Sequence, residues 1–299
     1  MQDDIIIPFE VGAGAVRGRI VRLGAAIDAI LKPHGFDDPV SELLGEAAAL
    51  TALMGSALKF DGKLIFQAHG DGAVRLLVAD YHSDGAVRAT ASVAGEIAGR
   101  GLAALMGKGH LALTIDQGPD MERYQGVTPI EGKTLEAAAV GYFDQSEQIP
   151  TAVRLAVGKV MRPGAGASWR AGGVIVQFMP GEGGTRERGE AALTSAEDRE
   201  TWDRAAAFLN TTQADELLDP ALAPQDLLYR LYHEDGVRVF APKLVRAACS
   251  CNAGKISAVL ERYSAQDLED LTEDGLIKVS CEFCRRDYFF DHEGREAKK

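Results

Sequence analysis

The first 180 residues show two patterns of hydrophobic positions, one typical of strands and one typical of a helix. Residues 16–23 alternate small or apolar with polar side chains, which is typical of a strand with one buried face. Pro39 then precedes apolar residues at helical spacing from Leu43 to Met54, and Ser41 is the predicted N-cap of this helix. Further strands are predicted from short apolar runs at residues 64–68, 74–78, 87–93, 111–115 and 174–178.

Three Asp-Gly pairs separate these runs, at Asp61-Gly62, Asp71-Gly72 and Asp84-Gly85. An Asp-Gly pair between apolar segments favours a tight hairpin turn, because both residues tolerate positive φ. Consecutive hairpins build an antiparallel sheet. The pattern therefore predicts an α+β domain over residues 1–180, in which an antiparallel sheet packs with helices.

The composition of the chain changes after Pro180. Gly181-Glu182-Gly183-Gly184 predicts a break in regular structure, and residues 181–240 carry thirteen acidic but only six basic side chains. Two short amphipathic helices are predicted here, one capped by Ser195 and one following Pro224. Helices this short are marginal alone, so we expect a helical linker that lies on another surface. Its apolar positions are Trp202, Ala205, Ala206, Leu209, Leu227, Leu228, Leu231 and Tyr232.

Residues 241–299 hold all four cysteines of the chain, in two pairs. One residue separates Cys249 from Cys251, two separate Cys281 from Cys284, and 29 residues lie between the pairs. Four thiolates in two close pairs match a tetrahedral zinc site, because each pair can chelate the metal. A segment this small also commonly needs a metal or disulfides to fold. The sequence therefore predicts a small zinc-binding domain with these four cysteines as ligands.

Other interpretations of the cysteines remain open from the pattern alone. Four unrelated buried thiols, a permanent structural zinc site, and a thioredoxin-like redox pair at Cys281 and Cys284 would use the same residues. The single residue between Cys249 and Cys251 would point their sulfurs to opposite faces of a strand, so we expect a local turn there. His292 is a further candidate ligand, although four cysteines already complete a tetrahedral site.

Zinc and disulfides would stabilise this domain to very different extents. Structural zinc contributes about 10–16 kcal/mol to the folding of a small peptide at neutral pH. A disulfide within either cysteine pair closes a very short loop and constrains the unfolded chain by only about 1.5–2 kcal/mol, and a bridge from Cys251 to Cys281 by about 3.7 kcal/mol. Oxidation within the pairs would remove a large stabiliser and supply two small ones, so the domain would unfold.

The cysteine pattern resembles that of the heat shock protein 33 family, the redox-regulated 33 kDa chaperonins of the bacterial cytoplasm. Both pairs match the family's zinc-binding pairs in type, order and separation. Segments elsewhere in the chain are similar to the family as well, namely Leu58-Lys59-Phe60-Asp61-Gly62, Gly70-Asp71-Gly72, Glu122-Arg123-Tyr124-Gln125-Gly126-Val127, Ser146-Glu147-Gln148-Ile149-Pro150 and Leu228-Tyr229-Arg230-Leu231-Tyr232-His233-Glu234.

This resemblance implies an ATP-independent holdase whose reduced, zinc-bound form is monomeric and inactive. It implies that oxidation joins Cys249 to Cys251 and Cys281 to Cys284, releases zinc, and destabilises the linker. The protein would then dimerise and capture unfolding client proteins under oxidative stress.

The same resemblance assigns a role to each segment of the chain. Residues 1–180 would be the chaperone core, residues 181–240 the linker, and residues 241–299 the redox-switch zinc domain. Candidate client-binding residues, each of which would also suit ordinary packing, are Trp202, Phe208, Leu209, Leu217 and Leu218.

Composition and charge narrow the remaining function classes. The chain has 299 residues, 46% of them hydrophobic, which is ordinary globular composition, and its formal charge of -12 disfavours nucleic-acid binding. No apolar run of about 18 residues predicts a membrane span. The acidic opening at Asp3 and Asp4 differs from a basic secretory signal, so we expect a cytoplasmic protein. The sequence contains no catalytic nucleophile motif, so we do not expect an enzyme. The alternatives to a redox-regulated chaperone are a zinc-ribbon binding module and a thiol–disulfide oxidoreductase.

Overall fold

The computed structural model describes residues 3–12, 14–59, 61–118, 121–162, 164, 166–179 and 196–297. The chain forms two compact units, Met1–Ala247 and Ala248–Lys299. Within the described ranges, no helix combines the length and the apolar character that a membrane crossing requires. The glycine-rich segment predicted at residues 181–184 and the predicted cap Ser195 lie outside the described residues.

Two antiparallel sheets form the frame of the first unit. Its described strands are β1 (Ile5–Val11), β2 (Val16–Leu23), β3 (Lys63–Gly70), β4 (Val74–His82), β5 (Ala86–Val93), β6 (Gly109–Asp116), β7 (Tyr124–Pro129), β8 (Thr151–Arg162), β9 (Gly166–Phe178), β10 (Val237–Val239), β11 (Lys243–Leu244) and β12 (Arg246–Ala247). The first sheet has the order β10-β1-β2-β9-β8, with β11 also beside β1, and the second has the order β12-β5-β4-β3-β6-β7. Only the short β12 runs parallel to its neighbour, β5, among the described pairings.

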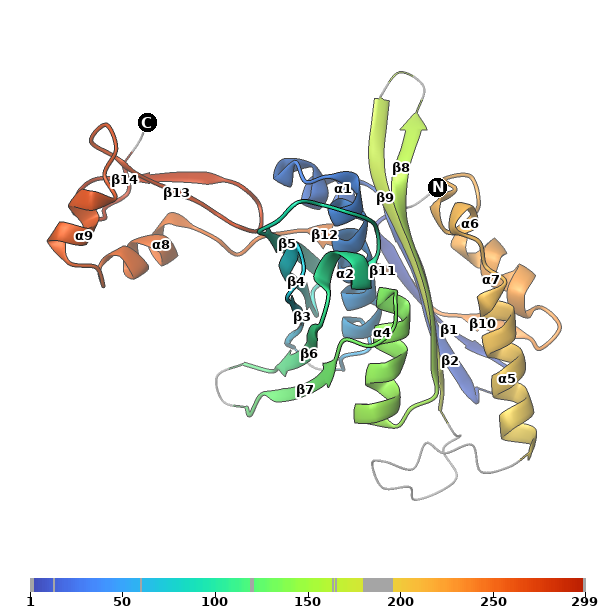
Figure 1. Ribbon diagram of the computed structural model, residues 1–299. Coiled ribbons are helices and arrows are strands. Elements are labelled where there is room, and N and C mark those ends of the chain that lie inside the picture. The colour runs from blue at the N-terminus through green and yellow to red at the C-terminus, as the bar shows by residue number, and fades with distance from the viewer. Residues whose placement is uncertain are drawn as a thin grey trace. The chain divides into compact units, whose positions relative to one another are not determined.

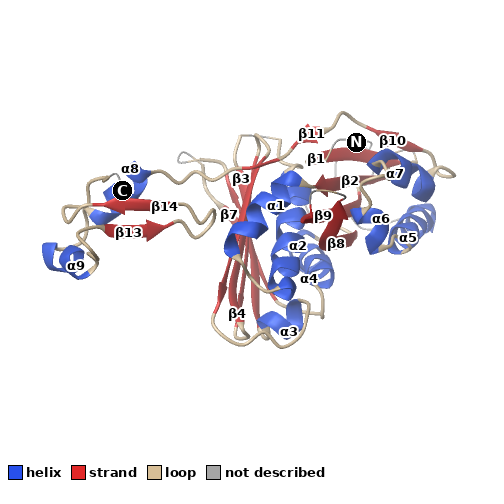
Figure 2. Ribbon diagram, turned by 90° about the horizontal axis from the view of Figure 1, so that it is seen from above, coloured by secondary structure: helices blue, strands red, loops and turns tan. Residues whose placement is uncertain are grey.

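Helices separate the two sheets and also cover the outer face of the first one. The described helical segments of this unit are α1 (Ala25–Leu31), η1 (Lys32–His34), α2 (Asp38–Gly55), α3 (Leu102–Met106), α4 (Leu135–Tyr142), η2 (Phe143–Glu147), α5 (Ala196–Asn210), α6 (Ala214–Leu218) and α7 (Pro224–Tyr232). Figures 1 and 2 show α1, α2 and α4 between the sheets, and α5, α6 and α7 on the far side of the first sheet. The predicted α+β class with antiparallel sheets is confirmed.

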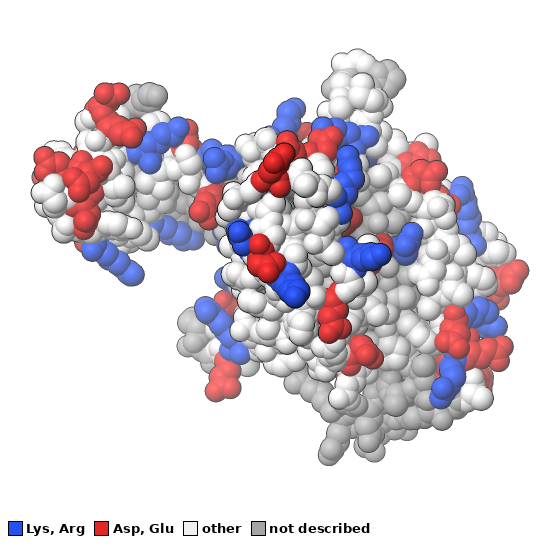
Figure 3. All heavy atoms as spheres, viewed as in Figure 1, with Lys and Arg blue, Asp and Glu red and all other residues white. Residues whose placement is uncertain are grey.

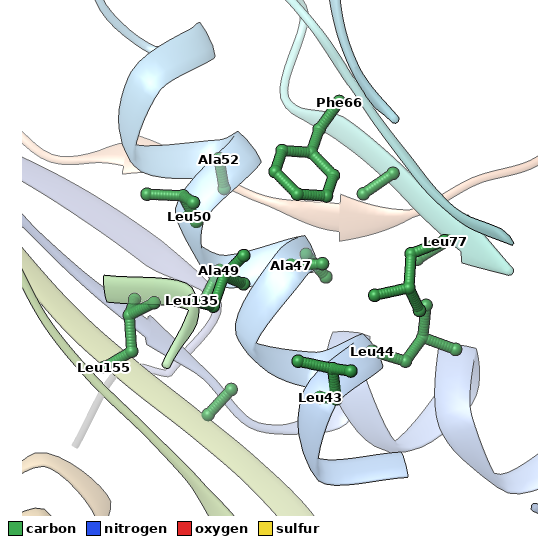
Figure 4. Close-up of a cluster of buried hydrophobic side chains, with 14 of the residues drawn as sticks. Leu43, Leu44, Ala47, Ala49, Leu50, Ala52, Phe66, Leu77, Leu135 and Leu155 are labelled. Atoms are coloured by element: carbon green, nitrogen blue, oxygen red, sulfur yellow. The ribbon is translucent and has the colours of Figure 1, made fainter. Parts of the chain in front are cut away.

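Helix α2 is the centre of the main core. Nearly every residue from Val40 to Leu53 is buried, as expected for a helix that is apolar on all sides and has a sheet on each flank. The small side chains of its alanines allow both sheets to pack close to the helix backbone. Figure 4 shows Leu44 and Ala47 beside Phe66 and Leu77 of the second sheet, while Leu50 faces Leu135 and Leu155.

The structure corrects two local predictions. Ser41 is not the N-cap of α2: the helix begins at Asp38 with Asp37 at the cap, because Pro39 fits the first helical turn, and the buried Ser41 hydroxyl donates to the Phe36 carbonyl at 3.3 Å. Asp71-Gly72 and Asp84-Gly85 do connect β3 to β4 and β4 to β5. Asp61-Gly62, however, lies between α2 and β3 and closes no hairpin.

The helices α5, α6 and α7, here called the helical layer, pack on the apolar outer face of the first sheet. Leu209 and Leu217 are buried in this second core, while Trp202, Phe208 and Leu218 are partly buried against it. Polar contacts add to the packing, since the buried Arg22 of β2 donates to the backbone carbonyls of Glu216 and Asp219. The two predicted amphipathic helices are therefore confirmed, and the surface beneath them is the first sheet.

After α7 the chain stays attached to the first unit through three very short strands. Strands β10 and β11 pair with β1, and β12 pairs with β5. The compact units consequently divide between Ala247 and Ala248. The finer division of the chain at residues 180/181 and 240/241 stays a prediction.

Candidate metal centre

The second unit has a small core of its own. Its elements are α8 (Ala253–Leu260), α9 (Ala265–Asp270), β13 (Ile277–Ser280) and β14 (Asp287–Phe290). Its buried apolar side chains in the described residues are Leu260, Leu268, Ile277 and Phe290. Burial of a few side chains contributes only about 1.5–3 kcal/mol each, which is little against the entropy of ordering a segment of this length. The unit therefore depends on a further constraint.

A tight hairpin turn positions the second cysteine pair. Strands β13 and β14 pair up to Ser280 and Asp287, and Cys281 and Cys284 lie in the connection between them. The Cys281 N–H donates to the Arg286 carbonyl at 2.9 Å, and the Arg285 N–H donates to the Cys281 carbonyl at 2.8 Å. Arg285 has a φ of 58°, in the left-handed region, which reverses the chain and brings both sulfurs to one side.

The first cysteine pair precedes α8 in an irregular segment. Asn252 caps this helix by accepting from the Lys255 N–H at 2.9 Å, and the Lys255 ammonium donates to the Ser250 carbonyl at 2.8 Å. The alternation of a strand does not apply to Cys249 and Cys251, because no strand is present there. The described chain between them is irregular and forms no regular turn, yet both sulfurs lie on the same side and reach the same cluster, as expected.

All four sulfurs meet in one cluster, with every ligand atom within 4.8 Å of the others. The Cys249 and Cys281 sulfurs lie 3.7 Å apart, and those of Cys251 and Cys284 lie 3.4 Å apart. A tetrahedral zinc ion with Zn–S bonds of about 2.3 Å requires sulfurs about 3.8 Å from one another. Four thiols at this spacing have the chemistry and the geometry that zinc requires.

The surroundings of the cluster act in opposite ways on the free thiol and on the metal-bound thiolates. Burial raises the pKa of the Cys284 thiol to about 12, and hydrogen bonds with Cys251 and Cys281 act in the same direction. A metal that binds the Cys284 sulfur therefore has to displace its proton. Four thiolates around Zn²⁺ carry a net charge of −2, and the Arg286 guanidinium lies close to offset it. A hydrogen bond with Tyr288 and the nearby Cys284 raise the pKa of Arg286.

The structure also identifies a residue that the sequence did not indicate. The Tyr288 hydroxyl donates a hydrogen bond to the Cys251 sulfur at 3.2 Å. His292, considered as an extra ligand from sequence, is exposed and is not part of the cluster, and its Nε2 lies 3.9 Å from a Glu293 carboxylate oxygen. The cluster therefore consists of the four predicted cysteines, with the Tyr288 hydroxyl as a hydrogen-bond donor beside it.

Comparison with known proteins shows similarity to one family over almost the entire chain. The model of the family described as Hsp33 protein matches residues 4–291. The chain belongs to the Hsp33 family. A 33 kDa chaperonin of Caulobacter vibrioides (strain NA1000 / CB15N) is 46% identical over 301 residues, which cover 98% of this chain and 96% of the relative. The 33 kDa chaperonin of Chromobacterium violaceum is 36% identical over 288 residues, which cover 95% and 90% of the two chains.

A solved structure shares the Hsp33 fold as well. The crystal structure of the 33 kDa chaperonin (heat shock protein 33 homolog) of Thermotoga maritima superposes with a TM-score of 0.81 at 23% identity, covering 98% of this chain and 96% of the other. Membership of the Hsp33 family supports a chaperone role and the binding of unfolded client proteins. The relatives are described as chaperonins, and the four-cysteine cluster is compatible with zinc binding.

The distribution of charge gives no sign of a nucleic-acid surface on the face seen in Figure 3. Basic and acidic side chains are interspersed there and form no continuous basic patch. With a net charge of -12, the Hsp33 chain lacks the overall positive charge that phosphate contacts require.

Proposed function

We propose that the protein is a redox-regulated, ATP-independent holdase of the bacterial cytoplasm. In its reduced form Cys249, Cys251, Cys281 and Cys284 hold zinc, and the protein is monomeric and inactive. Oxidation under stress joins Cys249 to Cys251 and Cys281 to Cys284, zinc leaves, and the protein dimerises and binds unfolding proteins. A cytoplasmic location fits this proposal, because a reducing compartment keeps the four thiols free to bind the metal.

The observation that carries the proposal is a four-sulfur cluster within a unit of very small core. The four cysteines converge from two segments 32 residues apart in the chain. When bound, zinc supplies the cross-link between these two segments and keeps the sulfurs as thiolates. Since the buried apolar core consists of a few side chains, loss of this cross-link leaves little to oppose the chain entropy. The state of the sulfurs is thereby coupled to the folding of Ala248–Lys299.

The oxidative step is chemically balanced with a peroxide as the oxidant. When their S–S bond forms, the two zinc-bound thiolates of a pair give up two electrons and leave the metal. Hydrogen peroxide accepts the two electrons and takes up two protons from solvent, its O–O bond breaks, and two water molecules result. Two peroxide molecules are consumed when both pairs are oxidised. The resulting disulfides close very short loops and constrain the unfolded chain weakly.

Unfolding of the second unit reaches the helical layer through the connecting strands. Only one residue separates Ala247 from Cys249. Between α7 and this point the chain is paired with the sheets through β10, β11 and β12, which have only two or three residues each. Strands this short have little independent stability. Once the second unit no longer anchors the chain, they fray toward α7 and weaken the packing of the helical layer.

The surface that binds clients would lie beneath and along the helical layer. Leu209 and Leu217 are buried against the first sheet, and Trp202, Phe208 and Leu218 are partly covered. Departure of the helices would uncover these side chains together with sheet residues such as Phe9 and Val176. A contiguous apolar surface of that kind binds the exposed apolar segments of unfolding proteins.

A client-aggregation assay tests the proposal. The protein, either reduced and zinc-loaded or oxidised with hydrogen peroxide, is mixed with a heat-unfolding client while light scattering is followed. Zinc release is measured in parallel with a chromogenic chelator. We expect suppression of aggregation only after oxidation, in step with metal loss and with a shift from monomer to dimer by light-scattering chromatography. A Cys281→Ser variant should bind zinc more weakly and protect the client partially without oxidant.

One outcome of this assay and two separate measurements would count against the proposal. Equal protection by the reduced, zinc-loaded form would contradict regulation by oxidation. Catalytic turnover of a disulfide substrate would indicate a thiol–disulfide oxidoreductase, and salt-sensitive binding of nucleic acid would indicate a zinc-ribbon binding module.

A further inference from the structure

A cavity of about 430 Å³ lies in the first unit, between the two sheets and beside the end of α2. Its walls come from four places in the fold: β2 and β9 of the first sheet, β3 and β6 of the second, the C-terminal end of α2 with the residues after it, and the α4–η2 segment. The lining is mainly apolar, with Leu53, Leu64, Leu113, Ile115 and Phe143 as its larger side chains. Its volume falls within the range of small-molecule sites, roughly 300–1,000 Å³.

Two cations face this apolar space without a partner. Arg19 of β2 lines the cavity, its Nε is buried without a hydrogen-bond partner, and its guanidinium makes no hydrogen bond or ion pair with any described residue. Lys59, at the exposed mouth, likewise forms no hydrogen bond or ion pair within the described part of the chain. A partly buried guanidinium with an unpartnered buried Nε costs free energy, and an anion supplied from outside would recover part of it.

The other polar groups of the lining are already engaged. The Glu147 carboxylate accepts hydrogen bonds from the Tyr124 and Tyr142 hydroxyls, at 3.0 and 3.4 Å. The Gln177 amide donates to the Thr151 hydroxyl at 3.3 Å. These contacts leave Arg19 and Lys59 as the polar groups free to select a ligand. An apolar space with two unpaired cations selects an apolar molecule that carries one negative charge.

We propose that this cavity binds a single-chain amphiphile with a carboxylate head group, with Arg19 and Lys59 pairing the carboxylate and the apolar walls covering the chain. An apolar protein cavity of about 150 Å³ takes up benzene, so the present volume accommodates a chain of about ten carbons. Burial lowers the pKa of the Arg19 guanidinium, and Arg17 acts in the same direction. A bound carboxylate would oppose both effects. The proposal is independent of the redox function, because no cysteine contributes to the cavity.

Isothermal titration with decanoate tests the site on the full-length, reduced, zinc-loaded protein. Decanoate is kept below its micelle concentration, and decanol serves as the neutral ligand of equal chain length. We expect one decanoate per chain and at least tenfold weaker binding of decanol, because a hydrogen bond to a charged group discriminates by about that factor or more. Decanoate should also raise the melting temperature of the protein.

Variants of residues inside and outside the cavity lining test where decanoate binds. Arg19→Met removes the charge and should weaken decanoate binding at least tenfold, while Arg19→Lys should restore part of it. Arg17→Met makes the same change at an exposed position of the same strand that does not line the cavity, and should bind as the natural chain does. Ala57→Trp places a large side chain on an exposed residue of the lining and should block binding, with circular dichroism confirming the fold.

The proposal is overturned by any of three results. The first is the absence of a decanoate binding signal. The second is equal affinity for decanol and decanoate together with unchanged binding in Arg19→Met, which would mean apolar association alone. The third is an equal loss of binding in Arg17→Met and Arg19→Met, or undiminished binding in Ala57→Trp, which would place the ligand elsewhere.

Discussion

The Tyr288 hydroxyl donates a hydrogen bond to the Cys251 sulfur at 3.2 Å. This hydrogen bond raises the pKa of Tyr288, so the hydroxyl keeps its proton and remains a donor. A hydrogen bond donated to a thiolate withdraws electron density from the sulfur and lowers its nucleophilicity. Under the proposed function, we therefore expect Tyr288 to slow the oxidation of Cys251 when zinc is bound.

The Tyr288→Phe variant should consequently lose zinc several-fold faster when treated with excess hydrogen peroxide. The rate of metal release to a chromogenic chelator measures this directly. Tyr263→Phe, at an exposed tyrosine of the same unit, is the matched control and should behave as the natural chain does. Equal rates in the natural chain and Tyr288→Phe would mean that the hydrogen bond has no influence on the reactivity of the sulfur.

A buried carboxyl group in α2 gives the first unit a distinct pH dependence. Burial raises the pKa of Glu46 to about 8, and the nearby Glu136 and Glu42 act in the same direction. In the unfolded chain this group ionises near its ordinary value of 4.5. The unfolded state therefore loses the proton at lower pH than the folded state. The contribution of Glu46 to stability is complete below about pH 4.5 and is lost as the pH rises through about 8.

Replacement of Glu46 by Gln removes this dependence. Each pH unit between the two pKa values changes the free energy of unfolding by about 1.4 kcal/mol. Between pH 6 and pH 8.5 the variant should gain roughly 2–3 kcal/mol of stability relative to the natural chain. Denaturant unfolding at both pH values measures the difference, with the exposed Glu96→Gln as control. A difference that stays constant with pH would show that Glu46 is ionised in the folded protein.

At the scale of elements, the backbone of the helical layer lies very close to the first sheet at Gly172 of β9. A Cβ atom at this position would lie 2.4 Å from the backbone carbonyl oxygen of Leu217 in α6. Backbone atoms cannot yield as a flexible side chain does, so α6 would have to move. Arg22, whose guanidinium donates to the carbonyls of Glu216 and Asp219, would lose its partners in the same shift.

The Gly172→Ala variant should therefore loosen the helical layer by about 1–3 kcal/mol while leaving all four cysteines untouched. We expect faster proteolysis within residues 196–232 and, under the proposed function, partial protection of a client without oxidant. Gly141→Ala in α4 is the matched control, because its Cβ would meet no atom within 4 Å. Unchanged proteolysis and no protection in Gly172→Ala would argue that the helical layer accommodates the methyl group.

The elements that could be predicted from sequence are those with a clear local pattern. The long helix around Leu44 and the alternating strand at residues 16–23 follow from periodicity, and the cysteine spacing indicates the metal cluster. Strand β1 was missed because a buried strand that is an apolar run, such as Ile5–Val11, shows no alternation. The contact of Tyr288 with Cys251 and the cavity beside Arg19 depend on segments distant in sequence. No local pattern reports such contacts.

At the scale of the whole molecule, the two compact units should respond differently to loss of metal. The first unit contains a large core around α2, whereas the buried core of the second consists of Leu260, Leu268, Ile277 and Phe290. Apolar burial thus stabilises Met1–Ala247 independently, while Ala248–Lys299 depends on the sulfur cluster. When the metal is removed, we expect the second unit to unfold, the helical layer to loosen partly, and the core around α2 to stay folded.

Hydrogen exchange of the reduced protein before and after treatment with a strong zinc chelator measures this order. Amides of α8, α9, β13 and β14 should lose protection almost completely, and those of α5 to α7 should lose part of it. Amides of α2 and β3 should keep their protection, since their core contains no cysteine. Addition of zinc under reducing conditions should restore the original pattern and exclude irreversible damage. Full protection of α8 and β13 in the chelated protein would show that the small core suffices without the metal. Simultaneous loss in α2 would show that the two units unfold as one.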